Sequence, residues 1–277
     1  MKVKARAKVN LALDVLKKRE DGYHDLDMIM APVALYDELE IEPADKEEIL
    51  CEGELLPENN TLSRTMKLLR ENYPIKNTYR ITVHKGIPSQ AGLGGASADA
   101  AALLKAVNEL EHLNLSTKRL MELGAKIGAD VPFCVYDAPA RVRGTGEIVS
   151  PIEMDWAIPV LLVKPDAGIS TPACFSACDE IEDRKPLDID IVQDALAKED
   201  LGLLYQTMDN ALEPVACQLA PVLRCIRDEL NDAGIVRVMM TGSGSTMMGF
   251  SVDEEVMEEA CGKLSERYPF VRLTVIG

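Results

Sequence analysis

The stretch Ile87-Pro-Ser-Gln-Ala-Gly-Leu-Gly-Gly-Ala-Ser-Ala-Asp99 is the most unusual part of the chain because it is built almost entirely from small residues. Alternating apolar residues over 79–84 predict a strand before it, and the apolar stripe from Leu103 to Leu110 predicts a helix of about 15 residues after Gly95. Glycine permits positive φ, and the free N–H groups at a helix start attract anions. The stretch therefore predicts a strand–loop–helix unit that binds a polyphosphate, with a plain tight turn as the alternative.

Three well-known nucleotide loops do not match this stretch. A Walker A loop ends in Gly-Lys-Ser or Gly-Lys-Thr, and no lysine occurs between Ile87 and Asp99. A Rossmann loop needs a third glycine where Ser97 stands, and it follows the first strand of its domain. The HRD and DFG motifs of protein kinases are absent. These mismatches argue against a nicotinamide-dependent oxidoreductase and leave a different kind of phosphate loop.

The second half of the chain predicts a β-α-β-β-α-β order, the split pattern of a ferredoxin-like layer. The expected strands cover 158–164, 235–240, 246–252 and 271–276, and the helical segments cover 189–209, 214–232 and 254–267. Together with the first half, this predicts an α+β protein of two domains, residues 1–155 and 156–277.

The first strand has a basic face. Residues 3–13 alternate apolar and polar side chains, which predicts a half-buried strand with Lys8 and Asn10 side by side on its outer face. Seven of residues 1–19 are basic, in a chain whose formal net charge is −16. This surface is either an ordinary solvated face or a means of attracting an anionic substrate.

Three further segments have both a structural and a functional interpretation. Asp130, in Gly-Ala-Asp-Val-Pro, is either a turn or cap residue or the partner of an attacking hydroxyl. Tyr23-His24 follows an Asp-Gly turn, and it is either loop surface or a stacking site for a base. The small residues 241–246 form either a simple hairpin turn or a second loop that faces the first.

Composition limits the classes of partner. The net charge of −16 argues against nucleic acid as a partner. The sequence contains no run of about 18 apolar residues, so we expect no membrane span. Seven cysteines without a secretion signal predict reduced thiols in the cytoplasm.

Five segments in this order resemble the GHMP kinases. They are Ala7–Leu11, Asp21–His24, Pro88–Ala101, Gly128–Pro132 and Thr241–Gly244. The resemblance implies an α+β domain paired with a ferredoxin-like domain, with the active site between them. It also implies transfer of the γ-phosphate of ATP, with Mg²⁺, to the 2-hydroxyl of a CDP-linked methylerythritol in the non-mevalonate route to isoprenoid precursors.

The resemblance also implies roles for individual residues. Lys8 and Asp130 match the active-site lysine and aspartate, with Asp130 as base or as hydroxyl anchor. Asn10, Tyr23, His24 and Thr171 match substrate positions, with Tyr23 and His24 at the cytidine. The ATP-phosphate loop corresponds to Pro88, Ser89, Gln90, Ala91, Gly92, Leu93, Gly94, Gly95, Ala96, Ser97 and Ala98.

This loop departs from the family pattern GLGGGSS at two positions, Ala96 and Ala98. Ala96 disfavours positive φ, and Ala98 removes a hydroxyl that would help to hold phosphate. We expect a monomer or homodimer that binds small molecules. The alternatives are a GHMP kinase for another alcohol and a non-catalytic nucleotide-binding protein of the same fold.

Overall fold

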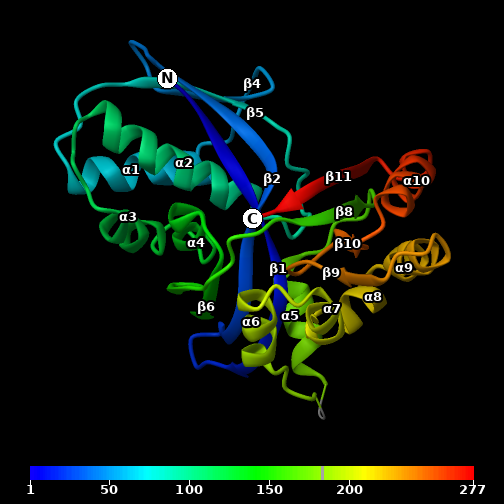
Figure 1. Ribbon diagram of the computed structural model, residues 1–277. Helices are drawn as coiled ribbons and strands as arrows, with labels where there is room; N and C mark the ends of the chain where they lie inside the picture. Colours follow the sequence, from blue (N-terminus) through cyan, green and yellow to red (C-terminus); the bar gives the residue numbers. More distant parts are fainter. Residues whose placement is uncertain (182–183) are drawn as a thin grey trace. The chain divides into compact units, whose positions relative to one another are not determined.

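A computed structural model describes residues 1–181 and 184–277 of the chain (Figure 1). The chain forms two compact units, each built from several segments. The first contains Met1–Ala7, Leu35–Ile87 and Gly94–Asp137, and the second contains Lys8–Ala34, Pro88–Leu93 and Ala138–Gly277. Strands β1 (Lys2–Lys18) and β2 (His24–Pro43) contribute residues to both units. The expected domain boundary at residues 155–156 remains a prediction.

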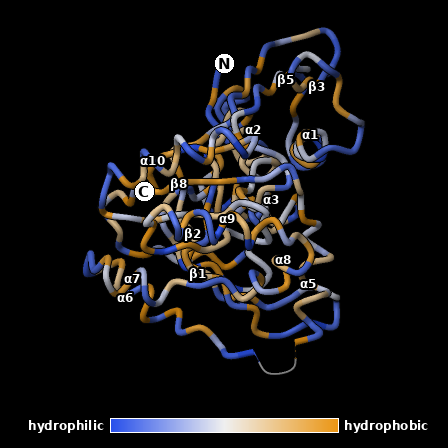
Figure 2. Tube along the Cα trace, turned by 90° about the vertical axis from the view of Figure 1, so that its right-hand side faces the viewer, coloured by the Kyte–Doolittle hydropathy of each residue, from blue (hydrophilic) through white to orange (hydrophobic). Residues whose placement is uncertain are grey.

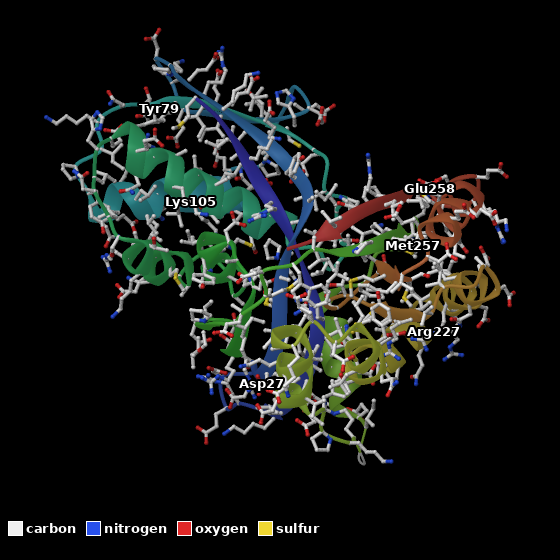
Figure 3. All side chains as sticks on the ribbon, in the orientation of Figure 1. Asp27, Tyr79, Lys105, Arg227, Met257 and Glu258 are labelled. Carbon is white, nitrogen blue, oxygen red and sulfur yellow. The ribbon has the colours of Figure 1, made fainter. Side chains whose placement is uncertain are left out.

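The first unit packs helices against a short sheet. The second part of β2 pairs antiparallel with β5 (Tyr79–His84), which pairs in parallel with β3 (Glu48–Cys51), and β3 is followed by β4 (Glu54–Leu55). Figure 3 marks Tyr79 on β5 and Lys105 on α2, the elements that precede and follow the glycine-rich loop. The four helices of this unit are α1 (Thr61–Asn72), α2 (Gly95–Leu110), α3 (Thr117–Gly124) and α4 (Val131–Tyr136).

The helix starts follow capping chemistry. Ser116 caps α3, since its hydroxyl accepts the Arg119 N–H at 3.2 Å. At α1 the cap is Asn60, whose side chain accepts the Ser63 N–H at 2.9 Å. Asparagine and serine are both strong N-cap residues, because their side chains accept the free N–H groups of the first helical turn.

The second unit contains the ferredoxin-like layer. Its strands are β8 (Ile158–Lys164), β9 (Arg237–Met240), β10 (Met247–Phe250) and β11 (Phe270–Ile276), and β11 follows α10 (Glu254–Ser265). They lie in the order β11-β8-β10-β9, with each neighbouring pair antiparallel. The predicted β-α-β-β-α-β arrangement is confirmed. Strand β6 (Ala140–Gly144) forms a hairpin with β7 (Ile148–Pro151) and also pairs with β2.

The helical region between β8 and β9 is more divided than the two expected segments. The Asp200 carboxylate accepts the Leu203 N–H at 2.9 Å and starts a new helix inside the expected segment 189–209. Pro221 directly precedes α9 and starts a new helix inside the expected segment 214–232, since proline is favourable where a helix begins. The helices are α5 (Thr171–Asp179), α6 (Ile189–Ala197), α7 (Leu201–Thr207), α8 (Glu213–Leu219) and α9 (Val222–Asp232).

The core of the second unit is continuous along its strands. Val160, Leu161, Leu162 and Val163 of β8 are fully buried, and this strand is strongly hydrophobic in Figure 2. Because this strand is buried on both faces, it is a continuous apolar run with no alternation. Within the part of the chain that the structure describes, no helix is long and apolar enough to cross a bilayer.

Candidate active site

Strand β1 is buried on both faces from Ala7 to Val15, which corrects the expectation of a half-buried strand. Lys8 is only 5% exposed and Asn10 only 1%. Their expected proximity holds, because Lys8 Nζ donates to Asn10 Oδ1 at 2.8 Å. The Asn10 N–H donates to Thr241 Oγ1 at 2.9 Å. The loop at Thr241 therefore covers a face that the alternation of β1 assigned to solvent.

The two loops of small residues contact each other directly. The N–H groups of Ser245 and Thr246 donate to the carbonyls of Gln90 and Ala91 at 3.3 and 3.2 Å. A Cβ atom added to Gly92 would lie 2.3 Å from the Thr241 carbonyl oxygen, so only glycine fits there. Residues 241–246 thus form the β9–β10 turn and also bind the first loop. The interpretation as a hairpin turn alone is therefore wrong, because the turn faces the first loop and contacts it directly.

Lys8 lies beside both loops. Its backbone N–H donates to the Leu93 carbonyl at 3.0 Å. Its ammonium lies 3.1 Å from the position that a Cβ atom on Gly242 would take. A buried cation next to two glycine-rich turns is suited to an anionic ligand, because low dielectric strengthens the attraction between opposite charges.

One face of α5 links the second loop to His24. Thr171, Phe175 and Asp179 follow each other at a spacing of four, so they form one stripe along about 12 Å of helix. The Thr171 and Ser243 hydroxyl oxygens are 2.8 Å apart. At the other end, the Phe175 ring stacks on His24 with a centroid distance of 4.9 Å. The stripe thus runs from a small-residue loop to an aromatic pair.

Asp179 fixes the orientation of His24. Asp179 Oδ1 and His24 Nε2 are 2.7 Å apart, and Lys18 Nζ donates to Asp179 Oδ2 at 2.7 Å. The hydrogen bond from Lys18, assisted by His24, lowers the pKa of the Asp179 carboxyl, which is therefore ionised at neutral pH. Tyr23, next to His24, is 62% exposed. An exposed tyrosine beside a stacked aromatic pair is well suited to binding a planar ring.

Asp130 lies in the first unit, directly before α4. Its carbonyl accepts the Cys134 N–H at 3.1 Å, while its side chain makes no capping hydrogen bond to the helix. A Cβ atom on Gly128 would lie 3.8 Å from Ser97 Oγ. The half-buried Asp130 is therefore the N-cap residue of α4 and follows a turn that packs against the first turn of α2, but it does not cap the helix through its side chain.

The glycine-rich loop needs positive φ at other positions than Ala96. Gly92 and Gly94 have φ of +74° and +72°, and Gln90 has +50°. Ala96 lies inside α2, where alanine is favourable. The expected backbone penalty at Ala96 is therefore absent, because the helix begins one residue earlier, at Gly95.

The basic face of β1 is neutralised locally. Lys17 lies 3.4 Å from Asp25, and Arg6 Nε donates to Asp137 Oδ1 at 3.0 Å. Three more of these bases pair with acids, Lys2 with Glu40, Lys18 with Asp179 and Arg19 with Asp21, whereas Lys4 lies over the uncharged Tyr36 ring. Surface pairs of this kind cancel much of the field that would attract a distant anion. For these bases, the pairing favours an ordinary solvated face over a surface that attracts an anionic substrate.

Comparisons with known proteins match this architecture over nearly the whole chain. Residues 60–138 match the GHMP kinases N terminal domain, and residues 192–269 match the GHMP kinases C terminal model. The 4-diphosphocytidyl-2-C-methyl-D-erythritol kinase of Caldicellulosiruptor bescii is 39% identical over 90% of this chain and 88% of its own length. The chain belongs to the GHMP kinases.

Other relatives from this family agree. The 4-diphosphocytidyl-2-C-methyl-D-erythritol kinase of Clostridium tetani is 38% identical over 97% of both chains. A crystal structure of 4-(cytidine 5'-diphospho)-2C-methyl-D-erythritol kinase superposes with a TM-score of 0.84 at 31% identity, covering 100% of this chain and 99% of that one. Within the GHMP kinases, the resemblance expected from the sequence motifs is thereby confirmed.

The described residues of this GHMP kinase contain no ready-made cluster of metal-binding side chains. Among residues 1–181 and 184–277, no group of three or more His, Cys, Asp or Glu side chains is arranged to hold an ion. Mg²⁺ in phosphoryl-transfer enzymes usually binds one or two carboxylates plus substrate phosphates. An ion that is bound mainly by the phosphates of a nucleotide would not need such a cluster.

Asp99, at the end of the loop, has an unusual environment. It is 6% exposed. Burial raises the pKa of its carboxyl to about 7, the Lys85 ammonium opposes this shift, and the Asp37 carboxylate adds to it. Because the folded state holds the Asp99 proton more tightly than the unfolded chain, this group stabilises the fold most below pH 4. That contribution is lost as the pH rises through about 7.

We therefore expect the effect of Asp99→Asn on the stability of the fold to be more favourable at high pH than at low pH. The amide does not titrate, so the gain in unfolding free energy should be roughly 2 kcal/mol larger at pH 8 than at pH 5. Urea denaturation of both proteins at the two pH values measures this difference. An equal effect at pH 5 and pH 8 would show that Asp99 is ionised throughout.

Proposed function

We propose that this protein is an ATP-dependent kinase that phosphorylates the 2-hydroxyl of 4-diphosphocytidyl-2-C-methyl-D-erythritol. The observation that carries the proposal is the face of α5. Its Thr171 end meets the second small-residue loop, and its Phe175–Asp179 end meets His24. A substrate with a base at one end, a diphosphate and a branched alcohol is long enough to lie along such a stripe.

The glycine-rich loop is proposed to bind the ATP phosphates. Residues 88–98 lead into the first turn of α2, where free N–H groups and the helix dipole favour negative charge. Gly92 and Gly94 at positive φ let the backbone approach a ligand closely. Mg²⁺, held mainly by the phosphates, would supply positive charge that offsets the charge on the transferring group.

Asp130 and Lys8 are proposed to act on the reacting groups. Phosphoryl transfer depends mainly on positioning and charge stabilisation. The Asp130 carboxylate would accept or orient the proton of the attacking hydroxyl. Lys8, held by Asn10 and by the backbone of Leu93, would offset negative charge on the phosphoryl group. The fixed, buried position of Lys8 supports this role, because no reorganisation is then needed during the reaction.

His24, Tyr23 and Phe175 are proposed to bind the cytidine end. With Nε2 held by Asp179, the other ring nitrogen of His24 is available to the base. Stacking on aromatic rings is suited to a planar pyrimidine. Phe175 and Asp179 did not emerge from the sequence motifs, although the four-residue spacing with Thr171 is visible in the sequence.

Removing the His24 ring should weaken binding of the cytidine substrate but not binding of ATP. Loss of a hydrogen bond and a stacking partner costs on the order of 1–2 kcal/mol, so His24→Ala should raise KM for the cytidine substrate about tenfold. KM for ATP should stay within about twofold. Steady-state kinetics with each substrate varied separately measure both constants. Parallel increases in both constants would contradict a cytidine role for His24.

A GHMP kinase for another alcohol is the principal alternative. Such an enzyme would use the same loop, Lys8 and Asp130, but it would not need the His24–Phe175 pair. A short alcohol such as mevalonate or homoserine has no base to occupy that position. The aromatic pair therefore favours the cytidine-linked substrate.

A further inference from the structure

Three charged side chains form a buried cluster at the ends of the glycine-rich loop. We call it the Asp37 cluster, and its members are Asp37 of β2, Lys85 just after β5 and Asp99 of α2. Asp37 is completely buried and Asp99 is 6% exposed. Lys85 ion-pairs with both carboxylates. None of the roles proposed above uses these residues.

Asp37 holds the start of the loop through both oxygens. Its Oδ1 accepts the N–H groups of Gly86 and Ile87 at 2.7 and 2.8 Å, and its Oδ2 accepts from Lys85 Nζ. A Cβ atom on Gly86 would lie 2.4 Å from the Tyr36 carbonyl oxygen. Gly86, just after β5, therefore lies directly against the backbone of β2, and the Asp37 carboxylate fixes it there.

Lys85 connects the start of the loop to its end. The same ammonium that binds Asp37 also donates to Asp99 Oδ2 at 3.3 Å. A Cβ atom on Gly95 would lie 3.2 Å from Ile87 Cγ2 and 3.5 Å from Lys85 Nζ. The first residue of α2 thus packs against the last residue before the loop. The Asp37 cluster therefore holds the two ends of the loop, Ile87 and Gly95, close together, and residues 88–94 form the loop between them.

We propose that Asp37 is a positioning residue for ATP, acting through Lys85 and the backbone of residues 86–87 to hold both ends of the phosphate loop. This inference rests on the proposed binding of ATP by the loop. Asp37 is fully buried, so it acts without touching the nucleotide. Donors that are fixed before the ligand arrives bind developing charge without reorganisation. The role therefore explains why a charged triad is buried at this point of the fold.

The same substitution at two carboxylates provides a matched test. Both Asp37 oxygens are engaged, so Asp37→Asn places an N–H₂ donor against the Lys85 ammonium or against two backbone N–H groups. Within the described residues, Asp99 Oδ1 has no hydrogen-bond partner. Asp99→Asn can therefore keep its oxygen towards Lys85. The two variants make the same chemical change, but only Asp37→Asn is expected to loosen the loop.

The first measurement is amide hydrogen exchange of the nucleotide-free protein, followed by mass spectrometry of peptides covering residues 86–98. In Asp37→Asn these amides should exchange about ten times faster, whereas in Asp99→Asn they should change by less than about twofold. Peptides from α10 serve as an internal control. Kinetics should then give KM for ATP raised about tenfold in Asp37→Asn, with KM for the alcohol substrate unchanged.

Unchanged exchange over residues 86–98 in Asp37→Asn would overturn the proposal, as would equal effects on both KM values. If Asp37→Asn does not fold, Lys85→Gln breaks the same connection, and unchanged exchange in that variant would also overturn it. The exchange measurement needs no turnover. A failure of the proposed function would leave it intact, so the two failures are distinguishable.

Discussion

Asp130→Asn is expected to lower kcat by a factor of 10² to 10⁴ while the fold and ATP binding stay intact. Loss of a general base or hydroxyl anchor typically costs about this much. The side chain makes no capping hydrogen bond to α4, so the isosteric amide removes little from the helix. The melting temperature should therefore change by no more than about 2 °C. Single-turnover kinetics and ATP titration separate the chemical step from binding.

Glu122→Gln is the matched control for this variant. Glu122 is an acid on α3, in the same unit as Asp130, and its side chain is 50% exposed and pairs only with Arg119 among the described residues. Removing this exposed charge should leave kcat within about twofold, since such pairs contribute little. A kcat near that of the wild type in Asp130→Asn would contradict the role of Asp130. A large loss in both variants would indicate a general effect of charge.

Gly92→Ala is expected to have the second largest effect. The residue has φ of +74°, which costs an L-residue roughly 1–2 kcal/mol. The added Cβ would also lie 2.3 Å from the Thr241 carbonyl, so the two loops must separate. Because the loop N–H groups would move with the backbone, we expect KM for ATP to rise at least about tenfold and the unfolding free energy to fall by about 1–3 kcal/mol.

Ala96→Gly is the control for this second prediction. Ala96 is exposed in the first turn of α2 and does not have positive φ, so glycine costs at most about 1 kcal/mol there. KM for ATP should stay within about twofold, although this change restores the usual family sequence. A normal KM for ATP in Gly92→Ala would show that contact between the two loops is not needed for nucleotide binding.

The sequence predicted the features that depend on local pattern. The ferredoxin-like order emerged because strands β8 to β11 are short and apolar and their turns contain glycine. The glycine-rich loop emerged because its composition is extreme. The burial of Lys8 was not predicted, since an alternating strand gives no sign that a loop 231 residues after Asn10 will cover its polar face.

Contacts across long stretches of sequence account for the other missing features. Asp37 looks like any polar residue in a strand, and only the fold brings it to Gly86, Ile87 and Lys85. The stripe of α5 was visible as a spacing, but its meaning depends on His24, which lies far from it in the sequence. Residue pairs of this kind require the tertiary structure.

The most direct test of the central claim is phosphate transfer to a panel of alcohols. The purified protein is incubated with ATP, Mg²⁺ and either 4-diphosphocytidyl-2-C-methyl-D-erythritol, mevalonate, homoserine or galactose, and ADP release is followed with a coupled assay. Mass spectrometry and ³¹P NMR identify the product. We expect turnover with the cytidine-linked substrate at least about a hundred times more efficient than with the others, and a new phosphate on the 2-hydroxyl. Comparable or better turnover of another alcohol, or no ADP release above background, would contradict the proposed function.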